Sequence, residues 1–163
     1  MTFAALIKIL EKQRQLHTSL YQLAVEKVEI IKNGDIHALN QMLKDEQSHA
    51  AAITMMEKER LKAIAVIFPN SSQHRTIRDC IALAEGEEKI KLIELHQELV
   101  SILENTKKQN DLNEQLIYQS LKFVNFSLNL LRPKQGAGTY APPYGKQQQR
   151  PANGSTSVFN SQA

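Results

Sequence analysis

Two long stretches of helical periodicity are separated by only three residues, and this spacing constrains the fold more than any other feature. Apolar residues recur every three to four positions over residues 2–32 and again over 36–68, which is the repeat of an amphipathic helix. The connection is Asn33-Gly34-Asp35, where the glycine suits the left-handed position after a helix and the aspartate caps the next one. Because the connection is so short, we predict that the second helix runs antiparallel to the first.

The second predicted helix carries a seam whose steps alternate between three and four residues, as in a coiled coil. Three charged residues, Glu46, Glu57 and Arg60, interrupt its apolar character. Each is therefore either partly exposed or paired across the seam. The full seam is Ile36, Leu39, Leu43, Glu46, Ala50, Ile53, Glu57, Arg60, Ile64 and Ile67.

The rest of the helical region is less regular. Residues 69–72 (Pro-Asn-Ser-Ser) end the second helix, and a short helix is predicted at 76–84. Gly86 either ends that helix or only weakens one longer helix. A long helix follows at 87–131, with Thr106, Asn110 and Asn113 as polar seam positions. We therefore predict an all-α fold over residues 1–131, in which long antiparallel helices form a coiled-coil-like bundle.

The end of the last predicted helix is apolar on more than one face. Its sequence from Leu116 is LIYQSLKFVNFSLNLL. One face of such a helix can pack on the bundle, and the excess indicates a partner or a dimer interface. The candidate binding residues are Leu116, Ile117, Leu121, Val124, Phe126 and Leu128.

The last 32 residues have a different composition. Residues 132–163 contain four of the six glycines, four of the five prolines, four basic residues and no acid. Residues 1–131 contain the other 16 basic residues and all 17 acids, so their net charge is −1, and the basic balance of the chain belongs to the C-terminal segment. We predict a flexible, disordered tail that is either inert or carries short recognition elements at its isolated hydrophobic residues. These residues are Tyr140, Tyr144, Val158 and Phe159.

Catalytic and metal-dependent functions find little support in the sequence. The single cysteine, Cys80, rules out an internal disulfide and a multi-cysteine zinc site, and it is most simply a small buried hydrophobe. Glu46 and His49 form one Glu-x-x-His pair, but a di-iron bundle needs two, so His49 is interpreted as a solvated side chain. Nothing selects one of the five histidines for phosphotransfer, and no phosphate loop or nucleophile motif is present. We expect no enzyme activity, metal or cofactor.

Nucleic-acid and membrane functions are also disfavoured. The predicted bundle is not basic, and four charges spread over the tail make a weak footprint for phosphate. No apolar run reaches the length of about 18 residues that a membrane span needs, and the N-terminus lacks the pattern of a signal peptide. We expect neither nucleic-acid binding nor stable membrane insertion, and a cytoplasmic location.

The chain resembles the FlgN family of bacterial flagellar export chaperones over nearly its whole length. The resemblance rests on the order and spacing of several elements, among them the turn at Asn33-Gly34-Asp35, the seam of the second helix, and Asn110 and Asn113 followed by the apolar helix end. Leu131-Arg132-Pro133 is similar to the Leu-Lys-Pro helix stop of the family. The segment 140–145 (Tyr-Ala-Pro-Pro-Tyr-Gly) is similar to its Tyr-x-x-x-x-Gly element, and the run 146–150 (Lys-Gln-Gln-Gln-Arg) matches no family feature.

The resemblance implies a cytoplasmic chaperone that does no covalent chemistry. FlgN-like proteins bind the C-terminal segments of the hook–filament junction proteins FlgK and FlgL and deliver them to the cytoplasmic domain of the export gate protein FlhA. We expect the apolar end of the last helix to bind the client, and Tyr140, Tyr144 and Gly145 to dock at the gate. The competing interpretation is a self-associating coiled-coil scaffold without a dedicated client, and a homodimer in the client-free state is compatible with both.

Overall fold

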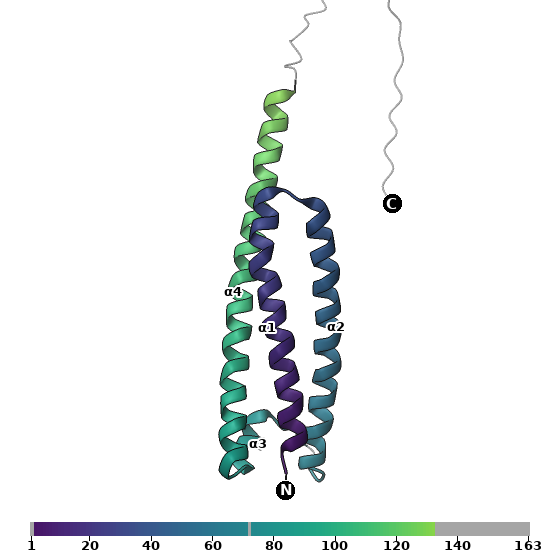
Figure 1. The fold of residues 1–163 in the computed structure, drawn as a ribbon, viewed down its shortest axis with the longest axis vertical. Coiled ribbons are helices and arrows are strands. Elements are labelled where there is room, and N and C mark those ends of the chain that lie inside the picture. The colour runs from purple at the N-terminus through teal and green to yellow at the C-terminus, as the bar shows by residue number, and fades with distance from the viewer. Residues whose placement is uncertain (1, 72, 133–163) are drawn as a thin grey trace, which may run out of the picture. The chain divides into compact units, whose positions relative to one another are not determined.

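The computed structural model describes residues 2–71 and 73–132, and the described part contains four helices (Figure 1). These are α1 (Ala4–Asn33), α2 (Ile36–Ile67), the short α3 (Ile77–Leu83) and α4 (Gly86–Leu131). The prediction of an all-α fold with long antiparallel helices is confirmed. The two alternatives at Gly86 are also resolved, because α3 ends before it and α4 begins at it with φ +56°.

The turn between α1 and α2 forms as its three residues predict. Gly34 adopts φ +64° at the end of α1, and its backbone N–H donates to the carbonyl of Ile31. The Asp35 carboxylate then accepts a hydrogen bond of 2.9 Å from the backbone N–H of Ala38 and caps α2. Both ends are thus satisfied within a two-residue connection.

Side-chain pairs give the direction of each helix. Between α1 and α2 the sequence separation of hydrogen-bonded partners falls from 44 residues at Gln13–Glu57 to 30 residues at Ser19–His49, so these helices are antiparallel. Between α1 and α4 the separation stays nearly constant, at 84 residues for Arg14–Glu98 and 89 for Asn113–Ala24. Helix α4 therefore runs in the same direction as α1 (Figure 1).

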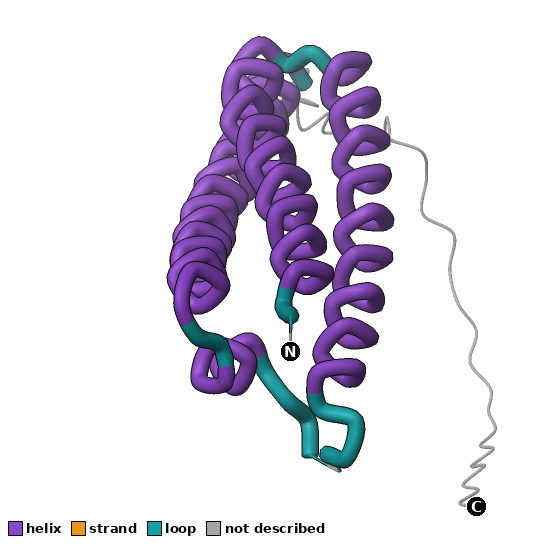
Figure 2. Tube along the Cα trace, turned by 60° about the horizontal axis from the view of Figure 1, so that its bottom comes forward, coloured by secondary structure: helices purple, strands orange, loops and turns teal. Residues whose placement is uncertain are grey.

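Helix α1 is the centre of the assembly. It packs against both α2 and α4, whereas α2 and α4 make no backbone contact with each other. Figures 1 and 2 both show α1 between its two neighbours. The short α3 contacts α4 and α2 at the end of the assembly where α1 begins.

The apolar core is concentrated at this α3 end. It joins residues from all four helices, and Leu6, Leu92, Leu95 and Cys80 are its most completely buried side chains, which confirms the interpretation of Cys80. The buried members of the cluster are Phe3, Leu6, Leu10, Ile64, Ile67, Cys80, Ala84, Leu92 and Leu95.

The predicted seam of α2 is only partly buried, and that part of the prediction is wrong. Ile64 and Ile67 are core residues, but Ile36 and Leu43 are exposed, and Met42, outside the predicted seam, is buried instead. The reason is that a coiled-coil stripe is buried only where partner helices cover its whole width, whereas α2 packs on α1 alone for most of its length.

Candidate functional site

An open groove runs along α1 between α2 and α4. It contains two hollows in line, of about 320 and 420 Å³, and each is lined by side chains from all three long helices. The hollow nearer α3 is lined by Leu10, Gln13, His17, Glu57, Arg60, His74, Arg75, Thr76, Ile77, His96, Leu99 and Leu103. The second is lined by Leu20, Lys27, Glu46, Ala50, Asn110, Asn113, Glu114 and Ile117.

A polar cluster of α1 and α2 side chains lies at the α3 end of the groove. Arg60 donates two hydrogen bonds to the Glu57 carboxylate, of 2.8 Å from Nε and 2.5 Å from Nη2, and Gln13 donates a third of 3.1 Å from α1. These donors, Arg60 foremost, lower the pKa of Glu57. Burial lowers the pKa of the neighbouring His17, against the opposing charge of Glu57.

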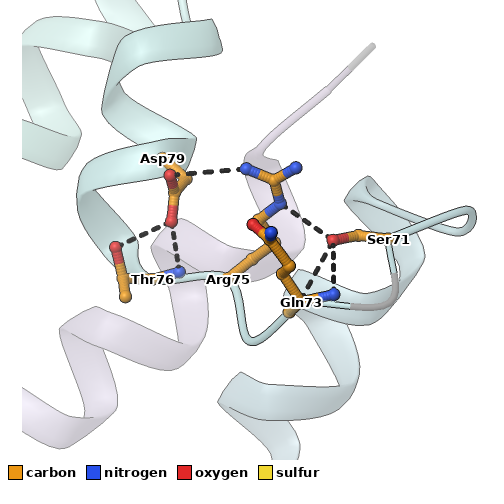
Figure 3. A network of polar contacts seen from close by, with 5 residues as sticks. All are labelled: Ser71, Gln73, Arg75, Thr76 and Asp79. Carbon is orange, nitrogen blue, oxygen red and sulfur yellow. Dashed lines mark hydrogen bonds and ion pairs between the residues drawn. The ribbon is translucent and has the colours of Figure 1, made fainter.

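The connection between α2 and α3 lines this end of the groove with His74, Arg75 and Thr76. Figure 3 shows the polar contacts around Arg75. Arg75 donates to the Ser71 hydroxyl at 2.9 Å and lies 3.7 Å from the Asp79 carboxylate. Asp79 in turn accepts from the backbone N–H and the hydroxyl of Thr76, at 2.7 and 2.9 Å. These hydrogen bonds lower the pKa of Asp79, and the Arg75 guanidinium also stacks over Phe68.

Polar contacts also hold the helices together at the second hollow. Lys27 of α1 forms a 2.5 Å ion pair with Glu46 of α2, so this interruption of the α2 seam is paired across the interface. Asn113 of α4 is 3% exposed and donates a 2.7 Å hydrogen bond to the backbone carbonyl of Ala24. At this hollow Glu46 of the predicted α2 seam and Asn113 of the predicted α4 seam thus connect helices, and α4 remains continuous through its polar positions.

The end of α4 extends past the α1–α2 turn (Figure 1) and exposes apolar side chains on several faces. A hollow of about 260 Å³ lies where α4 passes this turn, and Ile117, Leu121 and Val124 contribute to it from α4. The other lining residues are Ile30, Ile31, Gly34, Asp35, Ile36, Leu39 and Ser120. Because α4 has no neighbour beyond the turn, its last apolar residues pack on nothing within the described residues.

The six candidate binding residues of α4 thus fall into three groups. Leu116 is half-buried, and Ile117 lies at the rim of both the groove and the hollow at the turn. Leu121 and Val124 are 58% and 51% exposed on that hollow. Phe126 and Leu128 are exposed and line neither hollow. The gate-docking candidates Tyr140, Tyr144 and Gly145 lie outside the described residues.

His49 corrects one expectation from the sequence. It is not simply solvated: its Nδ1 donates to the Asp45 carbonyl at 2.8 Å, and its Nε2 accepts from the Ser19 hydroxyl of α1 at 2.8 Å. Both ring nitrogens are thus occupied by contacts within and between helices. Among residues 2–71 and 73–132, no group of three or more metal-ligating side chains is brought together. None of the described helices combines the length and apolar character required to span a bilayer.

Sequence reasoning missed the groove itself. Periodicity shows which residues share a face of a helix but not whether a neighbour covers that face. One available signal was the seam of α2, where an apolar stripe is interrupted by charged residues in the middle. Such a stripe suits a wall that is buried at its α3 end and open along the rest of its length.

Comparisons with known proteins identify the family of this chain. Residues 1–149 match the family model described as FlgN protein. The chain is 36% identical over 141 residues to the Bacillus subtilis (strain 168) protein named "Uncharacterized protein YvyG", and the alignment covers 86% of this chain and 88% of that protein. No solved structure matches the chain. The family match over most of the chain establishes that this protein belongs to the FlgN family of flagellar export chaperones, which are not enzymes.

Proposed function

We propose that this protein is a cytoplasmic chaperone that binds the C-terminal segments of FlgK and FlgL, prevents their premature assembly and delivers them to the cytoplasmic domain of FlhA. Family membership supports the general role in the export of flagellar hook-associated proteins. The particular clients and the delivery step are our proposal.

The observation that carries the client-binding part is the exposed apolar surface at the end of α4. Leu121, Val124 and Phe126 are each more than half exposed, and an amphipathic client helix can bury such side chains by packing along them. Burial of one valine or leucine side chain stabilises a complex by about 1.5–3 kcal/mol, which is enough for a few residues to carry most of the affinity.

The test replaces Val124 by aspartate and measures binding of C-terminal FlgK and FlgL peptides by calorimetry. Val124→Asp removes apolar contact and introduces an unpaired charge, so we expect affinity to fall at least a hundredfold. Val66→Asp is the matched control, because Val66 is 78% exposed near the end of α2, at the opposite end of the assembly. Unchanged affinity in Val124→Asp, with unchanged helix content, contradicts this assignment.

We assign gate docking to the tail residues Tyr140, Tyr144 and Gly145, on the basis of the resemblance of residues 140–145 to the family element. The double variant Tyr140→Ala/Tyr144→Ala is expected to keep client affinity and to lose binding to the FlhA cytoplasmic domain. Phe159→Ala, an aromatic deletion in the same tail, is the control. If the double variant and the control bind FlhA equally well, the two tyrosines have no docking role.

The exposed end of α4 also suits a second copy of this chain, as a self-associating scaffold requires. Solution mass with and without a client peptide separates the two functions. A monomer, or a dimer that the peptide converts to a one-to-one complex, supports the chaperone. A dimer that ignores the peptide supports the scaffold.

A further inference from the structure

The α2–α4 groove is long enough for a helix of several turns. Its walls are stripes of α2 and α4, and its floor is a stripe of α1. On α4 the lining residues run from His96 through Asn113 to Ile117, where the groove meets the hollow at the α1–α2 turn. At 1.5 Å per residue, this stripe is about 32 Å long and matches a helix of about 22 residues.

The two ends of the groove differ in charge. Near α3 the lining side chains include Arg60, Arg75 and one acid, Glu57. Asp79, which pairs with Arg75, does not line the hollow. Three imidazoles, His17, His74 and His96, add further hydrogen-bond donors there. Near the α1–α2 turn the charges are reversed, because Glu46 and Glu114 outnumber Lys27. The groove thus favours negative charge at the α3 end and positive charge at the turn end.

This asymmetry determines which way a helix fits. The N-terminal end of a helix carries a partial positive charge and its C-terminal end a partial negative charge. A helix therefore fits best with its N-terminal end near Glu46 and Glu114 and its C-terminal end near Arg60 and Arg75. Acidic side chains in its last turns and a free terminal carboxylate strengthen the same preference.

We propose that the client segment lies in the α2–α4 groove as an amphipathic helix with an acidic C-terminal end, parallel to α2 and antiparallel to α1 and α4. This assignment rests on the proposed chaperone function and adds the location and direction of the client. The client completes a four-helix bundle. Its N-terminal end lies beside Ile117, which also lines the hollow at the α1–α2 turn. Client residues that precede the helix therefore reach Leu121 and Val124 on the exposed end of α4.

Site-directed cross-linking tests both location and direction. The protein is prepared as His96→Cys or Glu114→Cys, two positions about 27 Å apart along α4. The probe is a C-terminal FlgK peptide of about 22 residues, with one cysteine added at either its N- or its C-terminal end. Cys80 is completely buried, so the unaltered protein is the control for background cross-linking.

We expect the C-terminal cysteine of the peptide to cross-link with His96→Cys and the N-terminal cysteine with Glu114→Cys. The reverse pattern overturns the direction. A peptide that binds the unaltered protein but cross-links at neither position overturns the groove and leaves the proposed function intact. Peptide-independent cross-linking between two copies of the protein, unaffected by added peptide, identifies a second copy as the occupant and also overturns the proposal. Failure of the unaltered protein to bind any FlgK or FlgL peptide overturns the proposed function itself, and this inference with it.

A charge variant gives an independent readout. His96→Glu places a negative charge at the α3 end of the groove and is expected to raise the dissociation constant of the peptide about two- to fivefold. His37→Glu makes the same change on an exposed residue of α2 that lines none of these hollows and is expected to leave it unchanged. Equal effects from the two variants contradict the charge complementarity.

Discussion

Asn113 offers the sharpest test of how α4 is held on α1. Its side-chain amide donates to the Ala24 carbonyl at 2.7 Å in a site that is only 3% exposed. The variant Asn113→Asp keeps the shape of the side chain but replaces the donor with a carboxylate oxygen. The matched control is Asn110→Asp, which adds the same charge to the same helix at an exposed position without a hydrogen bond to α1.

The expected cost follows from the geometry of this site. Loss of the hydrogen bond and exposure of the Ala24 carbonyl to a repelling oxygen cost about 1–3 kcal/mol. The total cost has an upper limit, because the new carboxyl can take up a proton instead of being buried as a charge. At pH 7 that protonation costs about 1.4 kcal/mol for each pH unit above the ordinary pKa of the carboxyl, or about 4 kcal/mol in all. Lys27 lines the same hollow and offsets part of the charge. We therefore expect Asn113→Asp to be about 2–3 kcal/mol less stable than Asn110→Asp.

Urea unfolding followed by circular dichroism at pH 7 and pH 4 measures this difference. Burial raises the pKa of the new carboxyl in the folded state, so the cost is largest at neutral pH and shrinks as the pH falls toward the ordinary pKa of a carboxyl. The protonated acid also regains a donor for the Ala24 carbonyl. Equal stabilities of the two variants at pH 7, or a difference that does not shrink at pH 4, refute the claim that this hydrogen bond holds α4 in register.

Three further predictions concern buried groups. Cys80 is buried, and burial raises the pKa of its thiol, so a thiol reagent should modify it only at the rate of unfolding; modification as fast as that of a free thiol contradicts the fold. The pKa of Glu57 is lowered chiefly by Arg60. The unaltered protein should therefore be more stable than Glu57→Gln at neutral pH, and this advantage should vanish as the pH falls through the folded-state pKa of Glu57. A stability advantage that is independent of pH contradicts the Glu57–Arg60 contact. Lys27→Met should cost about 1–2 kcal/mol by leaving the partly buried Glu46 unpaired, while Lys27→Met with Glu46→Met should be nearly neutral in urea unfolding; additive losses contradict an ion pair.

Much of the fold was predictable because its signals are local. The helix stripes, the capping aspartate at Asp35 and the glycine at Gly34 act within a few residues. The relation between α2 and α4 is not local. Ala50 of the predicted α2 seam lines the groove and is exposed. Whether it is covered depends on how far α4 lies from α2, and no periodicity in one helix encodes that distance.

The candidate site divides in the same way. The apolar excess on several faces of α4 predicted that part of its apolar surface is free, because one neighbour covers only one helix face. Which face is free was not predictable, and the structure exposes Leu121 and Val124. The partners of the polar seam residues were not predictable. His49 and Ser19 meet only because two helices align at one register, and spacing along either helix is silent about its neighbour.

The central position of α1 has a consequence for how substitutions combine. Helices α2 and α4 both contact α1 but make no backbone contact with each other. Outside the shared core at α3, the α1–α2 interface and the α1–α4 interface should therefore contribute to stability independently. Two substitutions, one on α2 near Glu46 and one on the face of α4 that is turned away from α2, should therefore lower the free energy of unfolding by the sum of their separate effects. A client that contacts both α2 and α4 would couple the two interfaces energetically. The departure from additivity after the client is added therefore measures the strength of that coupling.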